Sequence, residues 1–236
     1  MDNVIINREL SWLSFNARVL QEASDLTVPL VERIKFLGIY SNNMDEFFKV
    51  RVATIKRMID LKMDSKRMLG EKPKKLMQQV QEKVIEMQAK SQQTYLEILQ
   101  ELEHKKIYIV DETQLSPEQM DFVVSYFNDK VLSAISPIMV NNVDKFPYLE
   151  DRAIYLAARL TRANDDFEYA IVDVPTAVLP RFIELPGIGD KKYIILLDDI
   201  IRFNIMDVFA ISKYAKYETY TIKLTRDAEQ IGRAHV

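Results

Sequence analysis

The chain has 236 residues, a hydrophobic fraction of 48% and a formal net charge of −3, so it can form one large domain or two small ones. The balanced charge gives no global reason to expect nucleic acid as a partner, although a local cluster of Lys and Arg could still hold a polyanion. The sequence contains no cysteine, which excludes disulfides, thiolate catalysis and zinc fingers and fits a reducing compartment.

The amino terminus begins with Met1 and Asp2 and lacks the basic segment that opens a secretion signal. No run of 18 consecutive apolar residues occurs, so the sequence predicts no transmembrane segment. We therefore expect a cytoplasmic protein.

The first predicted helix begins after Asn7, whose side chain can cap it, and should end near residues 24–25. Glu9 lies in its first turn, where a negative charge suits the helix dipole. Its wide apolar face consists of Leu10, Trp12, Leu13, Phe15, Ala17, Val19 and Leu20. Trp12 and Phe15 could form a platform for stacking bases, but on a face this wide we expect both in the core, which disfavours nucleic-acid binding.

A second apolar stripe with helical spacing runs from Leu30 to Ile59, and Ser41 is its one polar member. Near its centre, Asn43 and Glu46 have the spacing of a capping box, so we expect a new helix to start there. The Asn43 carboxamide would then lie near the surface, where it could cap the helix or bind a ligand edge. From the residues alone, the cap is the favoured interpretation.

Charged residues follow this junction. Asp45 and Glu46 would occupy the first turn of the new helix; they could bind magnesium, but we favour a role as partners of the helix dipole. Four basic residues could line a path for a polyanion or form a solvated helix face: Lys49, Arg51, Lys56 and Arg57.

A long amphipathic helix is predicted from residue 73 to residue 104, with His104 at its carboxyl end, where a cation is favoured. We interpret His104 as a surface residue rather than a catalytic one. Residues 107–110 are short, β-branched and aromatic and indicate a strand. We therefore place a domain boundary after Lys106.

The second half of the chain has an α+β pattern. Ser116 and Pro117 open a helix that Pro137 ends, and residues 197–209 form another helix after a strand at 193–196. Further strands are predicted at 153–160, 167–174 and 217–224. The stretches around Pro147, Pro175, Pro180 and Pro186 are interpreted as connections.

The sequence shows no self-contained catalytic site. It has only five glycines and contains no P-loop or other Gly-rich phosphate cradle. Its two histidines are His104 and His235, and neither has an orienting carboxylate nearby in sequence. We assign no catalytic residue and no metal ligand.

Three motifs, at residues 7–16, 18–23 and 41–51, closely resemble the amino terminus of bacterial polyphosphate kinases of the long, histidine-phosphorylating type. Weaker similarity continues through residues 180–182, 196–202 and 225–229. The resemblance implies an enzyme that reversibly transfers the terminal phosphate of ATP to inorganic polyphosphate. It also implies that the phosphorylated histidine and the Mg²⁺ ligands lie in carboxyl-terminal domains outside this chain.

The resemblance changes the interpretation of Asn43. In the family pattern the second Asn of the Ser-Asn-Asn run contacts the adenine of ATP, and residues 41–43 match that run. The resemblance further implies a homo-oligomer, a dimer or larger. Residues 231–236 resemble the translation of a sequencing-library adapter, so we expect a non-native scar and a natural protein that continues.

The predicted architecture is an all-helical amino-terminal domain at 1–106, which carries the adenine contact, followed by a truncated α+β head domain at 107–230. The parent protein would be an ATP-dependent polyphosphate kinase, and this chain alone would be inactive. The alternative is a non-enzymatic interaction module in which the helix at 73–104 is an assembly surface and Asn43 is only a cap.

Overall fold

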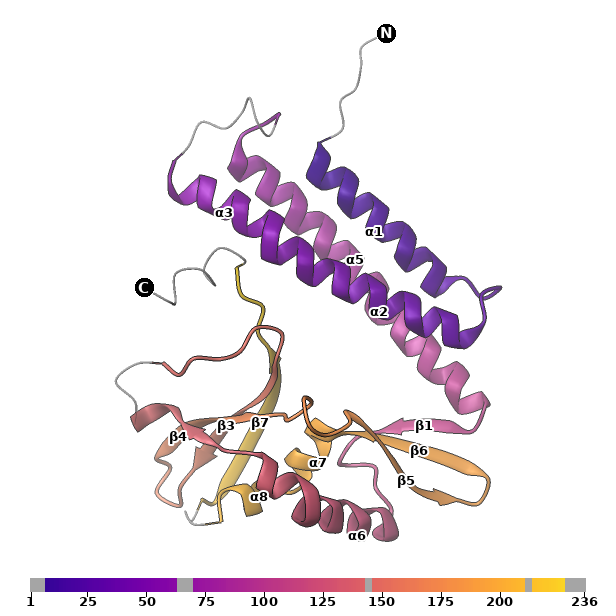
Figure 1. Ribbon diagram of the computed structural model, residues 1–236, viewed down its shortest axis with the longest axis vertical. Coiled ribbons are helices and arrows are strands. Elements are labelled where there is room, and N and C mark those ends of the chain that lie inside the picture. Colours follow the sequence, from indigo (N-terminus) through magenta and orange to yellow (C-terminus); the bar gives the residue numbers. More distant parts are fainter. Residues whose placement is uncertain (1–6, 63–69, 143–145, 211–213, 228–236) are drawn as a thin grey trace. The chain divides into compact units, whose positions relative to one another are not determined.

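The computed structural model describes residues 7–62, 70–142, 146–210 and 214–227 (Figure 1). The expected scar at 231–236 and His235 lie outside the described residues. The chain divides into two compact units, one formed by residues 1–101 with 225–236 and the other by residues 102–224. The first is helical and the second mixes strands and helices, as the sequence predicts.

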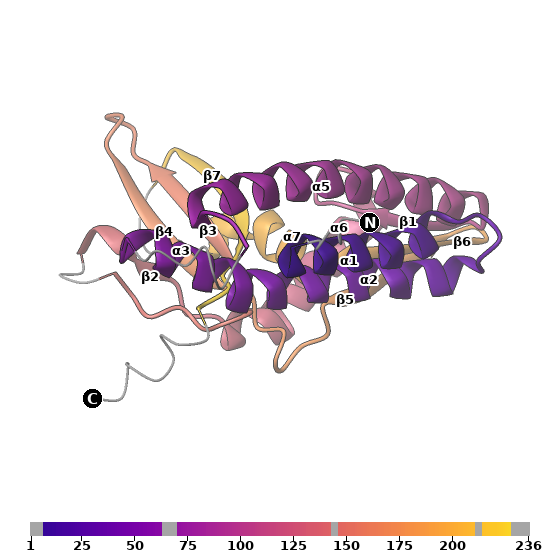
Figure 2. The same ribbon diagram turned by 90° about the horizontal axis from the view of Figure 1, so that it is seen from above.

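The helical unit contains three long helices that lie side by side in both ribbon views (Figures 1 and 2). Its elements are α1 (Arg8–Ser24), α2 (Leu30–Phe47), a π-helical segment η1 (Phe48–Val52), α3 (Ala53–Asp60) and α5 (Pro73–His104). The Asn7 side chain accepts a hydrogen bond from the Glu9 backbone N–H at 2.9 Å, which confirms the predicted cap.

The core of this unit is formed by the buried stripes of α1, α2, α3 and α5. Its members include Leu13, Leu20, Tyr40, Met44, Phe47, Ile55, Leu76, Val80 and Val84. The prediction for Trp12 is confirmed, since it packs against this core with its ring stacked on Phe47 at 4.9 Å. The prediction for Phe15 is wrong: its side chain is 48% exposed, and the Arg18 guanidinium lies over its ring.

The position after Phe15 explains this error. Asn16 is fully buried, so the inward-facing side of α1 is rotated toward Asn16 and away from Phe15. Because a polar residue occupies this buried position, the pattern of apolar residues alone does not show which side of α1 faces the core.

The second unit contains two small sheets. The first has the order β1-β6-β5, with β1 (Ile107–Val110) parallel and β5 (Phe182–Ile188) antiparallel to β6 (Lys191–Leu196). The second is antiparallel with the order β2-β4-β3-β7, formed by β2 (Ile138–Met139), β4 (Phe167–Asp173), β3 (Ile154–Thr161) and β7 (Lys216–Lys223).

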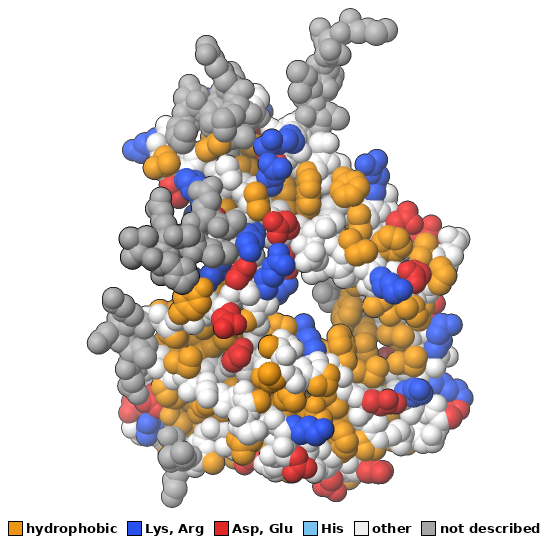
Figure 3. Space-filling model, in the orientation of Figure 1, with side chains coloured by type: hydrophobic (Ala, Val, Ile, Leu, Met, Phe, Trp, Pro, Cys, Tyr) orange, Lys and Arg blue, Asp and Glu red, His pale blue; other side chains and the backbone are white. Residues whose placement is uncertain are grey.

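Helices complete this unit and join the two sheets through one apolar core. They are α6 (Pro117–Tyr126), the π-helical η2 (Phe127–Val131), the 3₁₀ segments η3 (Leu132–Ala134) and η4 (Val140–Asn142), α7 (Leu197–Phe203) and α8 (Ile205–Val208). Ser116 caps α6 in a full capping box with Gln119. Figure 3 shows hydrophobic side chains gathered on the visible face of this unit.

Two predictions for the second unit are wrong. The stretch at Pro186 is part of β5, not a connection; β5 is an edge strand with irregular register between Leu185 and Ile188, where proline is tolerated. The helix predicted at 197–209 is divided at Asn204, whose side-chain N–H donates to the Ile200 carbonyl at 2.9 Å. Such a local bond competes with the backbone ladder of a helix.

Candidate functional site

Asn43 lies inside α2, one turn before its carboxyl end, and is not a helix cap. The helix continues from Leu30 to Phe47 without a break at residues 41–43, so the predicted new start there is wrong. The interruption of the α-helical pattern comes five residues later, as the π-helical segment Phe48–Val52. Such segments are often found at functional sites.

Asn43 can remain inside the helix because its carboxamide has a partner on another helix. Its Nδ2 donates to Oδ1 of Asn16 on α1 at 3.0 Å. Asn16 in turn donates from Nδ2 to the backbone carbonyl of Tyr40 at 3.2 Å. Asn16 lies 27 residues from Asn43 in sequence, so no local sequence pattern predicts their hydrogen bond.

Only part of the Asn43 carboxamide is used by this network. A carboxamide offers one oxygen acceptor and two N–H donors. The bond to Asn16 uses one N–H, and among the described residues no partner is found for Oδ1 of Asn43. Asn43 is half-buried rather than enclosed, and its acceptor and second donor are not used by the network.

The interpretation of Asp45 and Glu46 as first-turn residues is also wrong. Both lie in the last turn of α2, which continues directly into η1 and α3, so neither residue stands at the start of a helix. Within the described part of the chain, no three Asp, Glu or His side chains are grouped so that they could hold a metal ion.

The structure brings three of the four singled-out basic residues to one pocket. Lys49, Lys56 and Arg57 line a hollow of about 570 Å³ together with apolar side chains of η1 and α3 and with the segment after β7. Two carboxylates, Asp60 and Asp227, also line it, and Arg57 pairs with Asp227 at 3.1 Å. The pocket therefore carries a small excess of positive charge.

Arg51 does not belong to this pocket. Its Nε lies 3.8 Å from Oε2 of Glu9, a carboxylate that is 4% exposed and also pairs with Arg8 at 2.8 Å. His104 is exposed in the last turn of α5, as predicted.

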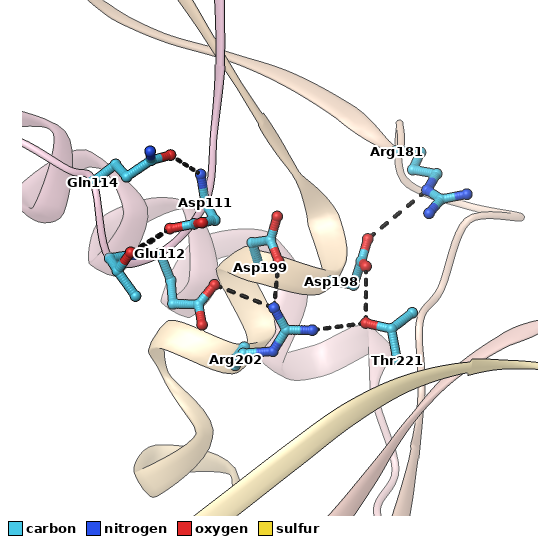
Figure 4. Close-up of polar contacts among 9 residues, drawn as sticks. Asp111, Glu112, Gln114, Arg181, Asp198, Asp199, Arg202 and Thr221 are labelled. Atoms are coloured by element: carbon cyan, nitrogen blue, oxygen red, sulfur yellow. Dashed lines mark hydrogen bonds and ion pairs between the residues drawn. The ribbon is translucent and has the colours of Figure 1, made fainter. Parts of the chain in front are cut away.

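Sequence reasoning missed a polar cluster in the second unit, drawn in Figure 4, in which Asp198 and Asp199 are buried and the other members are partly or fully exposed. Arg202 on α7 is its centre: Nη1 donates to Asp199 at 2.6 Å and to Glu112 at 3.2 Å, and Nη2 donates to Thr221 at 2.7 Å. The Thr221 hydroxyl donates to Asp198 at 3.2 Å. The one available signal was the spacing of Asp199 and Arg202, which places them on the same helix face.

The cluster is rich in carboxylates. Burial and, after it, the neighbouring charge of Asp198 raise the pKa of Asp199 from 3.8 to about 6, although Arg202 acts in the opposite direction. Arg181 lies 3.8 Å from Asp198, and its Nε has no hydrogen-bond partner among the described residues. Because its members come from α7, β7 and the segments beside β1 and β5, the cluster joins the two sheets.

None of the helices that the structure describes is both long and apolar enough to cross a bilayer.

Comparisons with known proteins match nearly the whole chain. Family models for the polyphosphate kinase N-terminal domain and the polyphosphate kinase middle domain match residues 5–110 and 118–231. Polyphosphate kinases from Vibrio cholerae and Escherichia coli are 44% identical over 232 residues and 39% identical over 238 residues; each match covers 97% of this chain and 33% of the relative.

A solved structure of a polyphosphate kinase also matches nearly the whole chain. The crystal structure of polyphosphate kinase from Porphyromonas gingivalis matches with a TM-score of 0.82 and 31% identity, and the match covers 95% of this chain and 33% of that chain. The chain therefore spans about a third of the length of these relatives.

Proposed function

The chain belongs to the polyphosphate kinase family, and we propose that the full-length protein reversibly transfers the terminal phosphate of ATP to inorganic polyphosphate. In this proposal a histidine outside this chain attacks the γ-phosphorus in line, and Mg²⁺ stabilises the charge on the transferred group. The ligands of that ion, like the histidine, are proposed to lie outside this chain.

The proposed contribution of this chain is nucleotide binding. Residues 1–106 form a helical domain that presents Asn43 to the adenine of ATP, and residues 107–230 form part of a head domain. The observation that supports this role is that Asn43 is half-buried within α2, caps no helix, and keeps an acceptor without a partner among the described residues. An asparagine side chain can bond an adenine edge with its acceptor and one donor.

Replacement of Asn43 in the full-length protein tests this role. Asn43→Ser shortens the side chain and should raise the KM for ATP by roughly two- to a hundred-fold with little change in kcat, because the lost bond lies far from the transferred phosphate. Asn42→Ser is the matched control, since Asn42 is an exposed carboxamide on the same helix. An Asn43→Ser enzyme with wild-type KM for ATP would remove the adenine contact from the proposal.

We further propose that the pocket around Lys49, Lys56 and Arg57 contacts the polyanionic substrate. Support comes from the convergence of three cationic side chains on one hollow. Lys56→Gln in the full-length protein should raise the KM for polyphosphate and weaken its salt dependence. Lys35→Gln is the control, because Lys35 is an exposed cation on α2 that does not line the pocket. Equal kinetics of the two variants would contradict this assignment.

The full-length protein is proposed to be a homo-oligomer, and light scattering that shows only a monomer at micromolar concentration would contradict this.

A non-enzymatic assembly module is the second candidate function. Exposed apolar side chains on α5, namely Ile85, Tyr95 and Leu96, favour it. ATP binding by the intact protein separates the two functions, because a module requires no nucleotide.

A further inference from the structure

Asn16 is a buried polar residue that the proposed function does not yet use. Its side chain has no exposed surface, although it lies on the inner face of α1 among apolar neighbours such as Leu13 and Leu20. Its carboxamide bridges two points of α2, since it donates to the carbonyl of Tyr40 and accepts from Asn43. A buried carboxamide is retained in a core at a cost unless its bonds are made.

The direction of each bond in this network is fixed by chemistry. A backbone carbonyl can only accept, so Asn16 must turn Nδ2 toward Tyr40. Its Oδ1 then faces Asn43, and an oxygen acceptor requires a donor, so Asn43 must turn Nδ2 toward Asn16. The Tyr40 carbonyl therefore determines the orientation of both carboxamides.

This orientation determines what Asn43 offers to a ligand. Without Asn16, the Asn43 carboxamide could rotate by half a turn and exchange the positions of its oxygen and nitrogen. With Asn16, acceptor and donor are presented in one order. Adenine offers an N6–H donor beside a ring-nitrogen acceptor, whereas guanine offers an O6 acceptor beside an N1–H donor or an N7 acceptor. An order that suits adenine therefore opposes guanine.

We propose that Asn16 is a positioning residue that holds the Asn43 carboxamide in the orientation that accepts adenine nucleotides and rejects guanine nucleotides. The inference rests on the proposed contact between Asn43 and the base. It adds a second residue, on a different helix, and a specific consequence: the selectivity for the base depends on a side chain that the nucleotide does not touch.

The test compares ATP with GTP as phosphate donors of the full-length protein. Asn16→Leu, which has similar volume and no polar atoms, should lower the ratio of kcat/KM for ATP to that for GTP by roughly tenfold. It should raise the KM for ATP and leave kcat nearly unchanged. This ratio does not depend on how much of a variant is folded. Asn16→Ser provides a second variant with a smaller side chain, and it should shift the ratio in the same direction.

Two further variants separate positioning from general stability. Thr94→Val removes a buried hydroxyl from α5 that bonds only within its own helix, and it should leave the ratio unchanged at comparable thermal stability. In an Asn43→Ala background, Asn16→Leu should have no further effect on the ratio, because Asn16 acts through Asn43.

The outcomes distinguish the positioning role of Asn16 from the adenine contact of Asn43. If Asn43→Ala lowers the ratio but both Asn16 variants keep it, the positioning role is wrong and the adenine contact stands. If Asn43→Ala also keeps the ratio and the KM for ATP, the adenine contact itself is wrong. A wild-type protein that uses GTP as well as ATP would overturn the selectivity role of Asn16.

Discussion

Asp199 gives a prediction whose size follows from the structure. Its side chain is 10% exposed and lies among other carboxylates, with Arg202 as its nearest cation. Burial, aided by the charge of Asp198, raises its pKa from 3.8 to about 6. The difference spans about 2.2 pH units at about 1.4 kcal/mol each, so ionised Asp199 lowers the free energy of unfolding by about 3 kcal/mol.

The sign of the pH dependence follows from the direction of this pKa shift. Because the pKa of Asp199 is higher in the folded than in the unfolded state, its stabilising contribution is fully present below about pH 4 and is lost as the pH rises through about 6. Asp199→Asn cannot ionise. The stability of the variant relative to the wild type should therefore increase by about 3 kcal/mol between about pH 4 and about pH 7.5.

Urea unfolding of the α+β unit at several pH values measures this difference, and comparison with the wild type cancels the contributions of other groups. Asp207→Asn is the control for the loss of one negative charge, because Asp207 is an exposed carboxylate on the neighbouring α8. Parallel curves of unfolding free energy against pH for Asp199→Asn and the wild type would refute the reasoning.

Three further predictions concern the folded chain and its chemistry. Arg33→Ala should lower the free energy of unfolding of the helical unit by about 2 to 5 kcal/mol in urea, because Arg33 is 1% exposed, bonds a carbonyl of α1 and pairs with Glu101 at 2.5 Å. Ser116→Ala should lower the stability of the α+β unit by about 1 kcal/mol through loss of its capping box with Gln119, whereas Ser125→Ala, an exposed serine on the same helix, should not. The chain alone, incubated with γ-labelled ATP and magnesium, should acquire no acid-labile, alkali-stable label, and such a label would show a phosphohistidine within it.

The sequence was sufficient for most helices and strands because their signals are local. The cap at Asn7, the capping box at Ser116 and the long stripe of α5 depend on residues within a few turns of one another, and the structure confirms all three. The strand β5 was missed because proline normally opposes a central strand, and only the order of the sheet shows that β5 lies at an edge.

The site was predicted less well because its geometry depends on distant contacts. From the residues alone, Asn43 was interpreted as a cap because asparagine favours helix starts, yet it lies inside α2, where one N–H of its carboxamide bonds Asn16 on another helix. The carboxylate cluster was not predicted for the same reason, because Glu112 and Thr221 are 90 and 19 residues from Arg202 in sequence. A local pattern gives the residue types of such networks and not their partners.

Replacement of both Asn16 and Asn43 also distinguishes the two candidate functions, a nucleotide-binding site and an assembly module. A net hydrogen bond contributes only about 0.5 to 1.5 kcal/mol, and apolar residues of the same shape in place of both partners are often neutral or stabilising. An assembly module would therefore lose nothing if both residues were leucine, whereas a nucleotide site would lose its base contact. The double variant Asn16→Leu with Asn43→Leu should unfold at the wild-type temperature or above it and use ATP poorly. If instead it keeps the wild-type KM for ATP, the pair serves only to pack α1 against α2, and the helical unit holds no adenine contact at this position.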